Sequence, residues 1–139
     1  MAATFRVRVL TPERTVFEGE IVHLEAPGSE GFLGVLAHHA PLLTALRSGA
    51  LTLREESGRT QVFALSGGIL EVSDNQATIL ADAAERPEEI DVSRAESARE
   101  RAERRLAQRT PDIDVARAEG ALARAMNRIR VAREFGGAA

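Results

Sequence analysis

A seven-residue sequence occurs twice near the C-terminal end of the chain and limits what this part can fold into. Residues 90–96 read IDVSRAE and residues 113–119 read IDVARAE, so the two copies differ only at Ser93 and Ala116. In each copy an aspartate stands where the N-cap of a helix is needed, and strong helix formers follow it. The repeat therefore predicts two consecutive helices that fold into an antiparallel hairpin.

Apolar residues recur at helical spacing after each copy of the repeat. The stripe of the first helix comprises Val92, Ala95, Ala98, Ala102 and Leu106, and that of the second comprises Val115, Ala118, Leu122, Ala125, Ile129 and Ala132. Most of these residues are alanines, which allow two helices to approach closely but bury little apolar surface. We therefore expect a hairpin of marginal stability, which a ligand or a partner can bias.

The chain before Pro87 has strand character instead. Residues 5–9 alternate apolar and charged side chains, and similar runs continue to residue 82. Turn-forming pairs interrupt these runs at Ser48-Gly49, Ser57-Gly58, Gly67-Gly68 and Asp74-Asn75. Many short strands with such turns are typical of an antiparallel sandwich or barrel. The sequence thus predicts a β domain over residues 1–86, a helical hairpin over 87–135 and a disordered tail over 136–139.

Composition argues against several classes of function. Residues 1–86 carry 7 arginines and 11 acidic residues, and residues 87–139 carry 11 and 10, so neither part has the basic excess of a DNA-binding protein. Aromatic residues make up only 4% of the chain, too few for binding single strands by stacking. We expect no nucleic-acid partner. No apolar run approaches the length of a membrane span, and the N-terminus lacks a signal-peptide core, which favours a soluble intracellular protein.

No constellation of residues typical of catalysis or metal binding is recognisable. The sequence has no cysteine and no glycine pattern of a P-loop, a Rossmann fold or a nucleophile elbow. His38 and His39 are adjacent, and neighbouring side chains on a strand point to opposite faces. No carboxylate at helical spacing completes a zinc motif around the histidines. The sequence therefore predicts a protein that is not an enzyme, with no catalytic residue and no metal site.

Arginines in the predicted hairpin have two possible roles. Arg94 and Arg101 are seven residues apart, and Arg124 and Arg128 are four apart, so each pair shares a face of its helix. Four guanidinium groups in one cleft suit a polyphosphate. Acceptors for an exocyclic amine would then be Glu85 and Asp91. The alternative is that the arginines form solvated ion pairs of little energetic value with Glu96, Glu100, Glu103 and Glu119.

Several segments together closely resemble the ε subunit of bacterial F-type ATP synthase. They are GFLGVLAHHAPLLTAL at residues 31–46, SGGILEV at 66–72 and TILADAAE at 78–85. The hairpin sequences RRL at residues 104–106 and RAMNR at 124–128 are similar too. The resemblance extends over almost the whole chain, through two unlike domains in the same order.

This resemblance implies a ten-stranded antiparallel β-sandwich followed by a two-helix antiparallel hairpin. It also implies a non-catalytic subunit that lies on the central stalk, binds the γ subunit and the c-ring, and couples proton translocation to ATP synthesis. The helices of such a subunit extend toward the α/β catalytic head and then inhibit ATP hydrolysis. The protein would be peripheral to the cytoplasmic face of the cell membrane, through the Fo sector.

The resemblance further implies that ATP is a regulatory ligand of the hairpin. The motif Ile/Leu-Asp-x-x-Arg-Ala is matched at residues 90–95. The implied ATP contacts are Glu85, Ile90, Asp91, Arg94, Ala95, Arg101, Arg124 and Arg128. The second copy of the motif, which starts at Ile113 without an equivalent glutamate before it, is expected mainly to begin the helix that delivers Arg124 and Arg128. The alternative is a purely structural coupling subunit that binds no nucleotide.

Overall fold

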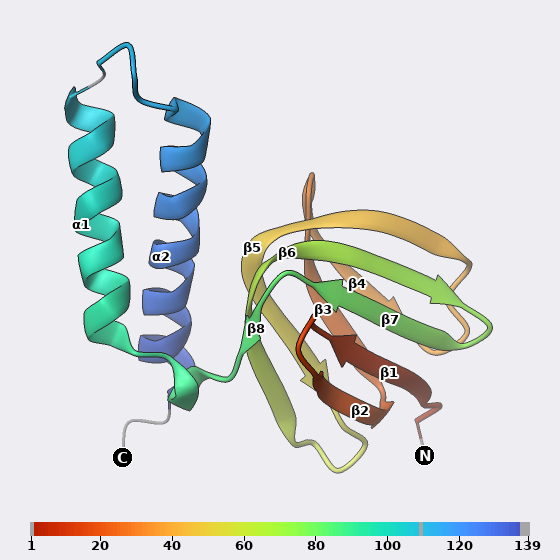
Figure 1. Ribbon diagram of the computed structural model, residues 1–139. Coiled ribbons are helices and arrows are strands. Elements are labelled where there is room, and N and C mark those ends of the chain that lie inside the picture. The colour runs from red at the N-terminus through yellow and green to blue at the C-terminus, as the bar shows by residue number, and fades with distance from the viewer. Residues whose placement is uncertain (1, 109, 137–139) are drawn as a thin grey trace. The chain divides into compact units, whose positions relative to one another are not determined.

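The computed structural model describes residues 2–108 and 110–136, and the chain divides into two compact units, Met1–Glu85 and Arg86–Ala139 (Figure 1). The described strands all lie in the first unit. They are β1 (Phe5–Leu10), β2 (Thr15–Ile21), β3 (His23–Gly28), β4 (Gly31–Leu36), β5 (Leu42–Arg54), β6 (Thr60–Ser73), β7 (Gln76–Ala81) and β8 (Ala84–Glu85).

The strands form one continuous curled sheet in the order β2-β1-β7-β6-β5-β3-β4, with β8 paired to β6. Its centre is the antiparallel pair β5 and β6, which are 13 and 14 residues long. The pairing of β1 with β7 is parallel, with Val7 opposite Ala77. Because the sheet curls, the inward side chains of all its parts meet in one core.

The predicted β domain followed by a two-helix hairpin is confirmed, but the described sheet does not have ten strands and is not wholly antiparallel. The described residues form eight strands, and the β1–β7 pair is parallel. The physical reason is that Ser48-Gly49 and Gly67-Gly68 do not end strands but lie inside β5 and β6. Gly67 and Gly68 have φ values of 98° and 147°, which bend β6 while Gly68 still pairs with both Leu46 and Ala81.

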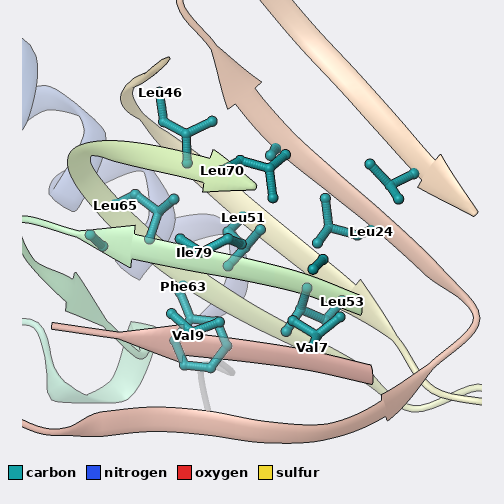
Figure 2. Close-up of a cluster of buried hydrophobic side chains, with 14 of the residues drawn as sticks. Val7, Val9, Leu24, Leu46, Leu51, Leu53, Phe63, Leu65, Leu70 and Ile79 are labelled. Atoms are coloured by element: carbon teal, nitrogen blue, oxygen red, sulfur yellow. The ribbon is translucent and has the colours of Figure 1, made fainter. Parts of the chain in front are cut away.

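The predicted alternation of apolar and charged side chains correctly indicates which side chains form the core of the first unit. In β1 the side chains of Phe5, Val7 and Val9 are buried, whereas Arg6 and Arg8 are exposed. Figure 2 shows Val7 and Val9 beside buried side chains of β3, β5, β6 and β7. Phe63 of β6 is fully buried in this cluster and packs edge to face on Phe17, with 6.3 Å between the ring centroids.

The second unit contains a short 3-10 helix, η1 (Pro87–Glu89), and two long helices, α1 (Val92–Gln108) and α2 (Val115–Phe135). Both predicted caps are confirmed. Asp91 Oδ1 accepts a hydrogen bond from the Arg94 backbone N–H at 3.1 Å, and Asp114 Oδ1 accepts one from the Arg117 N–H at 3.0 Å. None of the helices in the described part of the chain is long and apolar enough to cross a membrane.

The helices α1 and α2 run antiparallel and pack along the predicted stripes (Figure 1). Ala95 and Ala102 of α1 are buried, and so are Ala118, Ala125 and Ile129 of α2. The other stripe residues are half-buried. Two residues outside the stripe, Asn127 and Val131, are buried as well, on a helix that also contacts η1.

The last described residue of the hairpin is Gly136. Gly136 follows α2 and donates its N–H to the Ala132 carbonyl at 2.9 Å. The remaining residues of the expected tail, 137–139, and Arg109 of the expected inter-helix turn lie outside the described residues.

Candidate anion-binding face of the hairpin

The four arginines singled out from the sequence hold the same position relative to the packed seam of the hairpin. Each immediately precedes a buried seam residue: Arg94 and Ala95, Arg101 and Ala102, Arg124 and Ala125, Arg128 and Ile129. One residue corresponds to a rotation of about 100° around a helix. Two antiparallel helices are related by a twofold axis normal to the plane that contains both helix axes. Residues that stand one position before a seam residue therefore lie on the same side of this plane in both helices. The hairpin therefore brings the four arginines to one face.

Two further arginines share this offset. Arg105 precedes Leu106 on α1, and Arg117 precedes Ala118 on α2. We call the surface formed by Arg94, Arg101, Arg105, Arg117, Arg124 and Arg128 the arginine face. Within α1 and α2 as described, no residue immediately before a stripe residue is an aspartate or a glutamate. Asp91 and Asp114, which precede the stripe residues Val92 and Val115, stand just before the two helices, so the positive charge of this face is concentrated along the helices themselves.

The opposite face of the hairpin holds the ion pairs. Glu96, which follows Ala95, pairs with Arg133 across the two helices, and Glu103 pairs with Arg99 at 3.6 Å. No described residue forms an ion pair with Arg94, Arg101 or Arg124. The solvated ion pairs that were the alternative role for these three arginines are therefore not formed within the described residues, and two of the candidate glutamates are paired elsewhere.

Gly120 makes room for one of these guanidinium groups. A Cβ atom built on Gly120 would lie 3.3 Å from Arg124 Nη1, so the Arg124 side chain extends back along α2 over the glycine. A glycine inside a helix costs about 1 kcal/mol relative to alanine. At this position the smaller residue lets the guanidinium of Arg124 lie against the helix surface.

The other predicted contacts have structural roles in their own units. Asp91 caps α1 through one carboxylate oxygen, while the Ile90 and Ala95 side chains are buried. Glu85 is the last residue of the first unit, half-buried in β8, where it pairs with Ala64 of β6. Of the predicted set, the structure therefore gathers the arginines on one surface and uses the residues of the repeated motif to start and anchor α1.

A cavity of about 460 Å³ lies at the tip of the hairpin, where α1 ends and α2 begins. It is lined by Arg105, Gln108, Thr110, Asp114, Arg117 and Ala118, among others. Two of its arginines belong to the arginine face. The sequence did not predict a cavity at the tip of the hairpin. The signal for it was the second copy of the repeat, which supplies Asp114 and Arg117.

The first unit also has a candidate docking surface that the sequence analysis missed. Leu43, Ile69 and Leu80 are 70%, 46% and 51% exposed on the strands β5, β6 and β7. Ile69 pairs with Leu80 in the sheet, and a cavity of about 470 Å³ that both residues line continues to Leu10 and Pro12. Apolar residues at outward positions of three neighbouring strands are the signal for such an interface.

Comparison with known proteins gives consistent matches over the whole chain. The family described as "ATP synthase, Delta/Epsilon chain, beta-sandwich domain" matches residues 4–87, and "ATP synthase, Delta/Epsilon chain, long alpha-helix domain" matches residues 88–133. The ATP synthase epsilon chain of Desulforamulus reducens is 48% identical over 132 residues, which cover 95% of this chain and 99% of that one. That of Pelotomaculum thermopropionicum is 55% identical over 105 residues, covering 76% and 78%.

Solved structures show the same fold at low sequence identity. A chain of the Euglena gracilis mitochondrial ATP synthase, described as OSCP/F1/c-ring, has a TM-score of 0.77 and 24% identity, covering 96% of this chain and 82% of that one. A chain of the Tetrahymena thermophila mitochondrial ATP synthase, described as central stalk/c-ring, has a TM-score of 0.56 and 17% identity, with 96% of both chains covered.

Proposed function

The chain belongs to the family of ATP synthase delta/epsilon chains, as an epsilon chain of the bacterial F-type enzyme, and from this membership we propose that it couples proton flow to ATP synthesis and inhibits ATP hydrolysis through an ATP-sensitive hairpin. Epsilon chains are non-catalytic subunits of the complex. The observation that carries the ATP-sensitive part of the proposal is the arginine face, on which Arg94, Arg101 and Arg124 have no ion pair among the described residues.

In the proposed mechanism, ATP binds the folded hairpin. The triphosphate lies against Arg94, Arg101, Arg124 and Arg128 and relieves the repulsion among their guanidinium groups. The site also includes Glu85, Ile90, Asp91 and Ala95. A ligand that binds only the folded hairpin stabilises it by about 2.7 kcal/mol at one hundred times its Kd. Because the seam consists largely of alanines, this contribution is large enough to decide between the folded and the separated helices.

When ATP is scarce, the helices separate and extend toward the α/β catalytic head, where they block ATP hydrolysis. The first unit holds the subunit on the γ subunit and the c-ring, at the cytoplasmic face of the cell membrane. The apolar surface of Leu43, Ile69 and Leu80 supports this docking role, since it leaves large side chains exposed on three adjacent strands. The descriptions of the Euglena and Tetrahymena assemblies, which include a c-ring, agree with such partners.

ATP binding is tested on the full chain by calorimetry and by amide chemical shifts. We expect saturable binding, and we expect Arg124→Ala and Arg128→Ala each to weaken it about tenfold or more, because each loses a charge-assisted hydrogen bond to phosphate. Arg104→Ala is the matched control, since Arg104 is outside the arginine face and its side chain donates to the Glu100 carbonyl. Equal ATP affinity in all four proteins, or no saturable binding at millimolar ATP, would contradict the proposed site.

Inhibition is tested in the assembled ATP synthase. Truncation after Glu85 removes the hairpin, and we expect ATP hydrolysis at low ATP to rise several-fold while the complex still assembles through the first unit. The Arg124→Ala enzyme should stay inhibited up to higher ATP concentrations than the parent. If truncation leaves ATP hydrolysis unchanged at every ATP concentration, the purely structural coupling subunit is the correct interpretation.

A further inference from the structure

We propose that the cavity at the tip of the hairpin is a second nucleotide-binding pocket, in which Arg105 and Arg117 bind the phosphates. It is distinct from the ATP site proposed above on Arg94 and Arg128, and an internal repeat relates the two sites. Three observations carry the inference: the extent of the repeat, the symmetry of the hairpin and the chemistry of the cavity. Only the choice of a nucleotide as the ligand rests on the proposed function.

The repeat is longer than the seven residues with which it begins. Residues 90–105 and 113–128 align with a constant offset of 23, and 10 of these 16 positions are identical. Beyond the shared Ile, Asp, Val, Arg, Ala and Glu, the identical pairs are Ala98 and Ala121, Arg101 and Arg124, Ala102 and Ala125, and Arg105 and Arg128. Burial repeats with the sequence, because Ala95 and Ala102 of α1 and their equivalents Ala118 and Ala125 of α2 are all buried.

Two antiparallel helices with equivalent sequences are related by a twofold axis normal to their plane. Exchanging α1 and α2 about this axis carries Arg94 to the position of Arg117 and Arg128 to that of Arg105. Arg101 and Arg124 exchange with each other and therefore lie near the axis. The matching cap hydrogen bonds, 3.1 Å at Asp91 and 3.0 Å at Asp114, show that the equivalence holds in local geometry.

The exchange of α1 and α2 about the twofold axis places the equivalent of the proposed ATP site at the tip cavity. Its lining residues include the equivalents of Arg128, Ile90, Asp91, Arg94 and Ala95, which are Arg105, Ile113, Asp114, Arg117 and Ala118. Gln108, which also lines the cavity, stands 23 residues after Glu85 in the sequence. The cavity thus contains the second copy of the whole motif, with an amide in place of the glutamate.

The size and charge of the cavity suit a nucleotide. Its volume of about 460 Å³ is in the range of small-molecule sites, roughly 300–1,000 Å³. Arg105 and Arg117 are exposed, and within the described chain neither guanidinium has an ion pair. Carboxylates are present too, but Asp114 caps α2 through one oxygen and Asp112 accepts a hydrogen bond from the Thr110 hydroxyl at 2.5 Å.

The carboxylates of Asp112 and Asp114 restrict the class of ligand that the cavity can bind. The hydrogen bond from Thr110 lowers the pKa of Asp112, so this group stays ionised at neutral pH. A bare phosphate would meet two guanidinium groups together with two carboxylates. A ligand with phosphates at one end and hydrogen-bond donors such as an exocyclic amine at the other satisfies both sets of groups. This is the chemistry of a nucleotide, and we expect weaker binding than at the first site, where four arginines face the phosphates.

The test is a titration of the full 15N-labelled chain with ATP, with inorganic phosphate titrated in parallel. We expect two groups of amides to shift and saturate, residues 90–95 for the first site and residues 113–118 for the tip. The double variant Arg105→Gln/Arg117→Gln should weaken binding at the tip about tenfold or more and leave residues 90–95 responding as in the parent. Arg128→Ala should do the reverse. Arg104→Gln, which removes a neighbouring charge outside the cavity, should change neither group.

The outcomes separate the two sites. Saturation of residues 90–95 without any response of residues 113–118 overturns the tip pocket and leaves the proposed function intact. A tip response alone supports the tip pocket and counts against the first site. Loss of both responses in the Arg105→Gln/Arg117→Gln variant, with its helical amides unchanged, shows a single site and overturns the proposal. Equal affinity of the tip for phosphate and ATP overturns the nucleotide as its ligand.

Discussion

Replacing Phe63 with alanine is expected to lower the free energy of unfolding of the first unit by about 4 kcal/mol, in the range of Phe→Ala substitutions in cores. Phe63 is fully buried at the centre of the sheet and packs edge to face on Phe17. Its removal loses the transfer free energy of the ring and leaves a cavity that the surrounding strands cannot fill completely. The expected loss is a large part of the total stability of an ordinary domain.

The control for Phe63 is the same substitution at an exposed position. Phe32 is 49% exposed, and the Arg47 guanidinium lies 5.7 Å from its ring centroid. We expect Phe32→Ala to cost less than about 1 kcal/mol. Since the chain has no tryptophan or tyrosine, urea unfolding is best followed by the intensities of strand amides in NMR spectra. Similar losses for the two variants would show that the burial of the Phe63 ring contributes little to stability.

Replacing Gly68 with alanine is the second change with a large expected effect. The φ of Gly68 is 147°, and an added Cβ would lie 2.3 Å from the Leu80 carbonyl oxygen and 2.9 Å from Ala81 Cα. Both are backbone atoms of the paired strand β7, so no side-chain rotation relieves the clash. We expect the strands to move apart at this point, at a cost of about 4 kcal/mol in the stability of the first unit.

Gly58→Ala separates the effect of crowding from that of backbone conformation. Gly58 also has a positive φ, 95°, but nothing lies within 4 Å of an added Cβ. We expect this variant to lose about 1 kcal/mol, the cost of holding an alanine in the left-handed region. The measurement is again urea unfolding, together with the chemical shifts of the β6 and β7 amides, which should move in Gly68→Ala only. Equal losses would mean that the contact with β7 contributes nothing.

The Gly67-Gly68 pair also shows why the strand count could not be predicted from the sequence. A glycine with positive φ can end a strand in a turn or bend a strand that continues, and both patterns look the same along the chain. Only the pairing of Gly68 with Leu46 and Ala81 shows that β6 continues. By contrast, the alternation in β1 and the caps at Asp91 and Asp114 depend on nearby residues, and the sequence was sufficient to predict them.

The candidate site was predictable to a similar extent. The spacing of Arg94 and Arg101 places them on one side of a helix, but only the packed seam shows that Arg124 lies on the same side of the hairpin. The tip cavity depends on how α1 ends and α2 begins, and the repeat alone was interpreted there as a helix start. The exposed Leu43 and Ile69 were not selected because the sequence does not show which face of a strand is covered.

The two helix caps have a consequence for any separation of the helices. The hydrogen bond at Asp91 and the one at Asp114 each join an aspartate to an amide three residues further along the same helix. Pulling α1 and α2 apart therefore breaks neither bond, although it exposes the alanine seam and breaks the ion pair between Glu96 and Arg133. Each helix can therefore separate from the other while the hydrogen bond that caps its own N-terminal end stays intact.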